Sequence, residues 1–265
     1  MRENEGGVSE AIGYIIIFGL VMTGIGLVTL YGYPVLMQQE SSANIRNMEQ
    51  TMIVLQNDIK SLTYKLVPYK ETTLRVSGGT LMLVNQTSMD QFFNITYNDD
   101  TVGPDPFKPG ELRFIAQKEN AVISLENGAV IKREIGSTGS FMLAQPRWYV
   151  DTYTGSDTLM INYIQLGSRM EQPFLSQTGV GTVRMRHFQT MYWNPPSVNN
   201  GIVEITYSPS IVDNGAYDYS QAWRNFLTDS NGLAMTETAP NSNIYRRTDI
   251  DNVVIKVYDL IVEEL

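Results

Sequence analysis

The sequence predicts an α+β protein in which a long N-terminal helix precedes a mainly antiparallel, β-sandwich-like head with one short helix. Three observations lead to this fold class. The 29 residues from Ala11 to Gln39 carry no charged side chain. Apolar residues then recur every three or four positions from Ile45 to Leu66. Beyond Pro68, short apolar runs are separated by turn residues roughly every 8–12 positions, a spacing typical of a sandwich or two packed sheets.

The composition excludes several kinds of chemistry. The 265 residues include no Cys and a single His, His187. Disulfides, thiolate zinc sites, a Cys nucleophile and a multi-histidine metal site are therefore absent from this sequence. A net charge of −9 disfavours binding to nucleic acid, which requires a basic face. The sequence also lacks the Gly-rich phosphate-binding loops and the Gly-x-Ser-x-Gly elbow, so we expect a protein that is not an enzyme and uses no cofactor.

Residues 8–37 are expected to form a membrane-spanning helix. At about 1.5 Å per residue the uncharged run would extend over roughly 43 Å, more than the ~30 Å hydrocarbon core of a bilayer. The competing interpretation is a cleaved secretory signal, but its apolar region is only about 7–15 residues long. Tyr33 to Met37 also make a poor cleavage site. We expect the segment to remain attached, with Pro34 kinking the helix or ending it near Tyr33.

The start of this segment resembles a known family. A short polar leader, residues 1–7, precedes Val8-Ser9-Glu10-Ala11-Ile12-Gly13 and a run of aliphatic residues. This arrangement resembles the N-terminal segment of archaeal type IV pilin-like proteins over roughly residues 6–35. The leader departs from the family, where it is usually basic, because Arg2 is offset by Glu3 and Glu5. A plain single-pass anchor is the alternative interpretation.

The resemblance implies that a peptidase removes the leader and that the apolar helix then packs against copies of itself in a filament core. Glu10 would pair with the N-terminal amine of a neighbouring subunit, whereas in a plain anchor it would lie in the headgroup layer. Gly19 and Thr23 form a small-xxx-small pair that permits close helix approach. The residues expected to mediate self-assembly are Glu10, Ile12, Ile15, Ile16, Phe18, Gly19, Leu20, Thr23, Gly24, Gly26, Leu27 and Pro34.

Residues 38–67 are expected to form an amphipathic helical stalk. Its apolar positions alternate at spacings of three and four, which gives a seam along one face. The seam residues are Ile45, Met48, Met52, Leu55, Ile59, Leu62 and Leu66. The seam packs either against the following domain or against the helix of another subunit. Pro68 is expected to stop the helix.

Residues 68–265 are expected to form the head, which we place outside the cell. Hairpins are predicted at Val76–Thr80, where Gly78 and Gly79 are adjacent, and at Leu125–Ala129, where Asn127-Gly128 suits a type I′ turn. The predicted strands are Thr73–Ser77, Thr80–Val84, Phe92–Thr96, Glu111–Ala116, Ala121–Glu126, Ala129–Arg133, Phe141–Ala144, Trp148–Tyr153, Thr158–Leu166, Thr182–Tyr192, Ile202–Tyr207 and Asn252–Val262. The apolar spacing of Trp223, Phe226 and Leu227 predicts one short helix with Trp223 in the core.

The head contains few candidate binding residues. Asn85 and Asn94 each begin an Asn-x-Thr glycosylation triplet and are expected in exposed turn or strand-edge positions. The acidic loop Asn98-Asp99-Asp100 with Asp105 lacks the spacing of a known calcium loop, so a solvated turn is the favoured interpretation. His187, alone on a strand, is expected to be structural.

These observations favour a structural subunit of an archaeal type IV pilus-like filament at the cell surface. Its partners would be copies of itself, and the membrane before assembly. The alternative is an anchored protein that does not polymerise, such as a minor pilin, an adhesin or a stator-like component of a surface appendage. A membrane-tethered enzyme or solute-binding domain is a third possibility, for which the sequence discloses no site.

Overall fold

The computed structural model describes residues 5–65, 67–137, 139–169 and 174–265. The chain divides into two compact units after Asn44. The first unit is helical, and the second combines the head with the C-terminal half of a long helix. The helices are α1 (Glu5–Leu27), the π-helix η1 (Val28–Gly32), α2 (Tyr33–Tyr64), the 3₁₀ turns η2 (Gln86–Ser88) and η3 (Val212–Gly215), and α3 (Ser220–Thr228).

The described strands form two sheets in the second unit. Sheet A has nine strands in the order β7-β6-β5-β4-β1-β10-β14-β9-β8, and sheet B has five in the order β12-β13-β11-β2-β3. All described pairs are antiparallel except β14 with β9. The strands are β1 (Tyr69–Val84), β2 (Phe92–Tyr97), β3 (Asp100–Thr101), β4 (Glu111–Ala116), β5 (Ala121–Glu126), β6 (Ala129–Glu134), β7 (Ser140–Ala144), β8 (Tyr149–Tyr153), β9 (Ser156–Ser168), β10 (Phe174–Trp193), β11 (Gly201–Ser208), β12 (Thr236–Glu237), β13 (Ile244–Ile250) and β14 (Asn252–Glu264).

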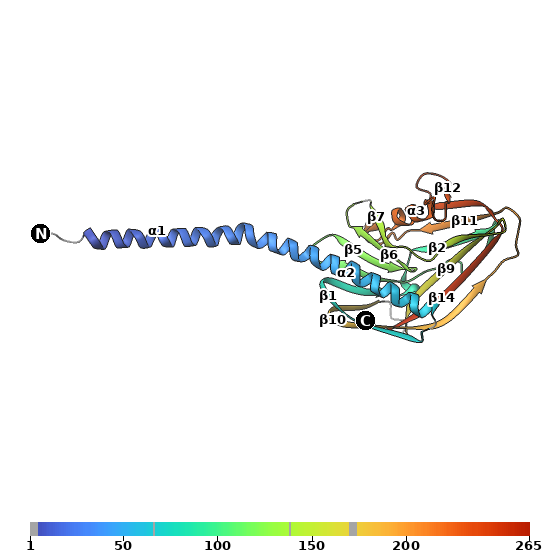
Figure 1. Cartoon of the computed structure of the whole chain (residues 1–265), viewed down its shortest axis with the longest axis horizontal. Coiled ribbons are helices and arrows are strands. Elements are labelled where there is room, and N and C mark those ends of the chain that lie inside the picture. The colour runs from blue at the N-terminus through green and yellow to red at the C-terminus, as the bar shows by residue number, and fades with distance from the viewer. Residues whose placement is uncertain (1–4, 66, 138, 170–173) are drawn as a thin grey trace. The chain divides into compact units, whose positions relative to one another are not determined.

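Sheet A lies between two hydrophobic cores. Alternate residues of a strand point to opposite faces, so β14 contributes Val253 and Ile255 to one core and Leu260 and Val262 to the other. The first core joins sheet A to sheet B and α3, and the second joins sheet A to α2 (Figure 1). The predicted sandwich-like head with one short helix is therefore confirmed, and Trp223 is fully buried in the first core.

The stalk seam faces sheet A. Six of its residues are buried in the core between α2 and the sheet: Ile45, Met48, Met52, Leu55, Ile59 and Leu62. Leu66 lies outside the described residues. Gln56 is buried beside the seam, and its Nε2 donates to the carbonyl oxygens of Gly128 at 2.6 Å and Gln145 at 3.0 Å. The seam and this polar anchor together hold the second half of α2 on the sheet.

The two prolines that border the predicted helices have different outcomes. The helix does not end at Pro34, because η1 leads directly into α2 at Tyr33. Pro34 has no N–H to donate within this continuous helix. The α-pattern is interrupted earlier, over Val28–Gly32. At the other end α2 finishes at Tyr64, about one turn before Pro68.

The predicted hairpin at Val76–Thr80 is wrong. β1 runs through these residues as one strand of 16, and its pairing with β10 shifts register between Val76 and Leu81. Gly78 adopts a φ of 72°, and a Cβ on Gly79 would lie 2.3 Å from the carbonyl oxygen of Ile115. The two glycines therefore form a bulge and permit close approach of β4. β10 and β4, which are distant in sequence, supply the partners that a hairpin would have provided locally.

The Asn127-Gly128 hairpin is confirmed. β5 and β6 pair from Glu126 with Ala129 onward, and the two turn residues have φ values of 48° and 74°. Positive φ at both central positions is the conformation of a type I′ turn. Asn127 also accepts a hydrogen bond from the backbone N–H of Ile164 at 3.0 Å, so this turn is tied to β9. β13, which pairs with β11, was not predicted.

The packing of α2 predicts a contrast between two adjacent residues. Leu55→Ala should lower the free energy of unfolding by about 2–5 kcal/mol, because Leu55 is fully buried and its truncation leaves a cavity. Val54→Ala should change it by less than about 0.5 kcal/mol, because Val54 is 49% exposed. Denaturant unfolding of the full chain in detergent measures both. Equal effects would contradict the assignment of the seam to the sheet.

Candidate functional site: an exposed apolar helix

The apolar segment, Ala11–Met37, carries large apolar side chains that the described chain leaves unburied. Its large side chains from Ile12 to Leu36 are each at least half exposed. They are Ile12, Tyr14, Ile15, Ile16, Ile17, Phe18, Leu20, Val21, Met22, Ile25, Leu27, Val28, Leu30, Tyr31, Tyr33, Val35 and Leu36. The buried apolar residues of the chain, in contrast, begin at Ile45. One N-terminal helix is therefore long and apolar enough to span a membrane among the described residues.

The segment is apolar on every side. Ile15, Ile16, Ile17 and Phe18 occupy four successive positions, which cover a full turn of helix. A helix that packs on one protein surface keeps a polar stripe on the opposite face. The segment has none, so its surroundings must be apolar on all sides.

The two threonine hydroxyl groups within the segment bond to their own helix. Thr23 Oγ1 donates to the carbonyl oxygen of Gly19 at 2.7 Å, and Thr29 Oγ1 donates to that of Ile25 at 2.9 Å. A donor facing hydrocarbon would otherwise remain unsatisfied at a cost of several kcal/mol. These bonds make the threonines compatible with lipid or with a dry helix interface.

A π-turn interrupts the segment at Val28–Gly32. The backbone N–H of Tyr33 donates to the carbonyl oxygen of Val28, five residues earlier. The proline that follows has no N–H to continue the ladder, so the altered spacing lies immediately before Pro34. The π-turn thus accommodates one extra residue in the helix immediately before Pro34.

The glycines of the segment have no role within the single chain. A Cβ built on Gly13, Gly19, Gly24 or Gly26 would meet nothing within 4 Å outside the helix's own backbone. Glycine in a helix interior is nevertheless about 0.8–1 kcal/mol less favourable than alanine. The isolated chain thus gives no packing reason for these four positions.

The other predicted assembly residues lie on the same helix. Ile12, Ile15, Ile16, Phe18, Leu20 and Leu27 are exposed, as are Thr23 and Pro34. Glu10 lies in α1, and its side chain is outside the described part. The structure therefore places these residues along one helix.

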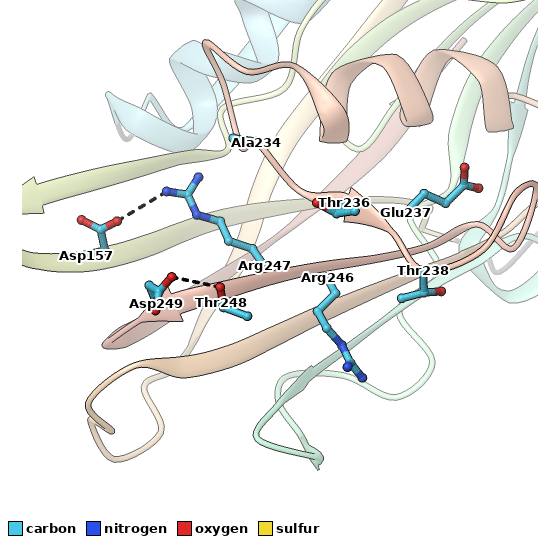
Figure 2. Close-up of a pocket in the computed structure, with 9 residues that line it drawn as sticks. All are labelled: Asp157, Ala234, Thr236, Glu237, Thr238, Arg246, Arg247, Thr248 and Asp249. Atoms are coloured by element: carbon cyan, nitrogen blue, oxygen red, sulfur yellow. Dashed lines mark hydrogen bonds and ion pairs between the residues drawn. The ribbon is translucent and has the colours of Figure 1, made fainter.

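The head contains an open hollow of about 640 Å³ beside β12 and β13. Figure 2 shows Asp157 reaching toward Arg247 across it, with 3.4 Å between Oδ2 and Nη2. Arg246 pairs with Glu204 at 3.1 Å, and Glu237 pairs with Arg224 at 3.1 Å. The charges around the hollow therefore fasten β13 to β9 and β11, and β12 to α3.

The acidic loop between β2 and β3 forms a turn. Asn98 and Asp99 have φ values of 51° and 69°, and the Asn98 Oδ1 accepts a hydrogen bond from the Ile202 N–H at 2.8 Å. No group of three or more potential metal ligands occurs among the described residues. His187 lies in β10 within 2.8 Å of the Thr190 hydroxyl.

The two glycosylation triplets are less accessible than expected. The expectation of an exposed position is wrong for Asn85, which is 2% exposed and whose Nδ2 donates to Ser168 Oγ at 3.1 Å. Its Oδ1 also caps η2 by accepting from the Thr87 N–H. Asn94 is half-buried within β2, opposite Thr206 of β11. Glycosylation of either residue remains a prediction.

One protein family matches nearly the whole chain. The family DUF7289, described as a family of unknown function, matches residues 7–263. The chain belongs to this family. The DUF7289 match includes both the apolar segment and the head, so the two units form one family architecture. No curated protein and no solved structure matches the chain.

The burial of Asn85 predicts that two substitutions that each remove its glycosylation triplet differ in their effect on the free energy of unfolding. Asn85→Gln should lower the free energy of unfolding by about 1–2 kcal/mol, because a longer side chain loses the bonds to Ser168 and η2. Thr87→Ala should change it by less than about 0.5 kcal/mol, because the Thr87 side chain is exposed and its backbone N–H is retained. Thermal unfolding compares the two. A stable Asn85→Gln variant would show that Asn85 is not a structural residue.

Proposed function

We propose that this DUF7289 member is a structural, non-enzymatic subunit of a type IV pilus-like cell-surface filament. The apolar segment would lie in the membrane before assembly and against the same segment of other copies afterwards. The head would form the outer surface of the filament. The observation that carries the proposal is that every large apolar side chain from Ile12 to Leu36 is at least half exposed, whereas the second unit has its own packed cores.

The free energy of hydration supports an apolar environment for the segment. Full burial of one large apolar side chain contributes about 1.5–3 kcal/mol. Seventeen such side chains, each half or more exposed, would release on the order of 20 kcal/mol on transfer from water. This exceeds the typical net stability of a folded domain, about 5–15 kcal/mol. An isolated chain in water is therefore strongly disfavoured relative to insertion or association.

The four glycines favour association over simple anchoring. A lone anchor in lipid has no need of positions without a side chain, whereas glycine lets neighbouring helix backbones approach closely. The resemblance of Val8–Gly13 to archaeal type IV pilin-like proteins supports the same choice. The Asn94 triplet, whose asparagine is half-buried rather than buried, supports an extracellular head, because such triplets act as acceptors in secreted proteins.

Electron microscopy of cell-surface filaments tests this function, with peptide mapping to identify the chain within them. We expect the peptides of the head in purified filaments and a mature N-terminus between Gly6 and Val8. Filaments that lack the chain, together with an unprocessed chain found only in the membrane fraction, would favour the non-polymerising alternative.

Glu10 provides a point variant of the same test. Glu10→Ala should abolish filaments while leaving the chain in the membrane fraction, because it removes the carboxylate proposed to pair with a neighbouring amine but adds no polar group. Glu40→Ala is the matched control, since it removes the carboxylate at the other end of the uncharged run. Electron microscopy and membrane fractionation measure assembly and insertion separately. Normal filaments from Glu10→Ala would contradict the pairing.

A further inference from the structure

Two fully buried carboxyl groups face each other beneath α3. Glu111 of β4 and Glu126 of β5 are directly opposite in the strand register, and neither has exposed surface. They point to the face of sheet A that packs on sheet B, since their strand neighbours Leu112 and Leu125 belong to the core against α2. Like charges directly opposite each other on a sheet repel, and burial removes the water that would screen them.

Glu111 has the partners of an ionised carboxylate. Its Oε1 pairs with the guanidinium of Arg113, and its Oε2 accepts from the Ser124 hydroxyl at 2.5 Å. The Tyr219 hydroxyl lies 3.3 Å from the same oxygen. One cation and two hydroxyl donors stabilise the charged form of Glu111.

Glu126 has neutral partners. Its Oε1 accepts from the Trp223 indole N–H at 2.6 Å, and its Oε2 accepts from the side-chain Nε2 of Gln91. The described salt bridges give it no cation, because Arg113 is engaged by Glu111. An ionised Glu126 would therefore be a second buried negative charge beside the first, with one arginine between them.

Gln91 carries a buried oxygen that matches a protonated partner. Its side chain is fully buried, and its Oε1 has no hydrogen-bond partner. The two ends of a carboxamide have nearly the same shape, so a half-turn exchanges the nitrogen and the oxygen. In that orientation Gln91 Oε1 accepts a hydrogen bond from the carboxyl O–H of Glu126, and the unpartnered acceptor is satisfied.

We propose that Glu126 is a neutral acid whose O–H donates a hydrogen bond to the side-chain oxygen of Gln91, and that this pair is a pH-sensitive clasp between the layers of the head. Trp223 belongs to α3 and Gln91 precedes β2. The clasp therefore links sheet A to α3 and to sheet B. Ionisation of Glu126 turns the Gln91 amide back to its donating orientation and leaves a carboxylate facing Glu111 without a cation of its own, so the contacts that hold α3 should weaken first.

The surrounding charges do not neutralise Glu126 directly. Arg133 of β6 donates to the backbone oxygen of Asp218, and the Asp90 side chain accepts from Ser210 and the Ile211 N–H. The Asp218 side chain accepts from Ser220, in the first turn of α3. The other groups facing the site are Glu111, Arg113, Tyr207, Tyr217 and Tyr219.

Burial raises the pKa of Glu126 to about 7, against opposing contributions from the Trp223 and Gln91 hydrogen bonds and the charge of Arg113. The unfolded chain titrates near 4.5. Between these two pH values the folded head therefore keeps a proton on Glu126 that the unfolded chain has already released. The stabilisation is complete below the unfolded pKa and is lost as the pH rises through about 7.

The protonation state is tested on the full chain in detergent with ¹³C-labelled glutamate carboxyl groups. We expect one glutamate signal to stay at the protonated position near neutral pH and to titrate at about 7. Glu126→Gln should remove that signal, whereas Glu111→Gln should shift its titration to lower pH, because it removes the facing charge and frees Arg113. If all glutamates of the wild type titrate near their ordinary value, the proposal is wrong, and this readout requires no variant to fold.

Thermal unfolding tests the clasp itself. The melting temperature of the wild type should fall relative to that of Glu126→Gln between about pH 5 and about pH 8, because the amide cannot ionise. Glu49→Gln is the control, since it alters a partly exposed pair with Lys132 elsewhere on the second unit. It should keep the wild-type pH dependence. A Glu126→Gln variant whose pH dependence equals the wild type would overturn the proposal.

Discussion

The apolar segment sets the conditions under which the whole chain can exist. Ala11 to Met37 present uncharged side chains on every face of a helix, and the structure buries none of the large ones. The threonine hydroxyls bond to the helix's own carbonyls, so the segment presents little that water would stabilise. Lipid and a bundle of like helices are the two surroundings that satisfy it. A protein that moves between these two states fits the proposed role of a filament subunit.

The second unit, in contrast, buries its own apolar side chains. The seam of α2 fills one face of sheet A, and sheet B with α3 fills the other. Gln56 and the Asn127-Gly128 turn add polar contacts that fix where the helix and β9 lie. The two parts of the chain therefore match two tasks of the proposed subunit. Association depends on the exposed apolar helix, and the outer surface of the filament depends on the packed head.

Local patterns predicted much of this structure. The uncharged run, the seam spacing and Asn127-Gly128 are each decided by a few neighbouring residues, and the corresponding elements were predictable from them. The hairpin predicted at Gly78-Gly79 was wrong because the strands that pair with this part of β1, β10 and β4, lie far along the chain. Gln56, Asn85 and Glu126 are polar residues in the sequence but are buried by groups from distant strands. Their roles follow from tertiary contacts that spacing does not disclose. Gly13, Gly19, Gly24 and Gly26 have no packing neighbour outside their own helix, so the single chain gives no packing reason for them.

The state of the purified full-length chain after detergent removal tests the central claim most directly. Analytical ultracentrifugation measures its mass, and electron microscopy shows the form of any assembly. Our account predicts that no dissolved monomer remains, and that the chain associates through its helix or enters added lipid vesicles. A stable, folded, monodisperse monomer in plain buffer would contradict it, because the exposed apolar side chains would then tolerate water.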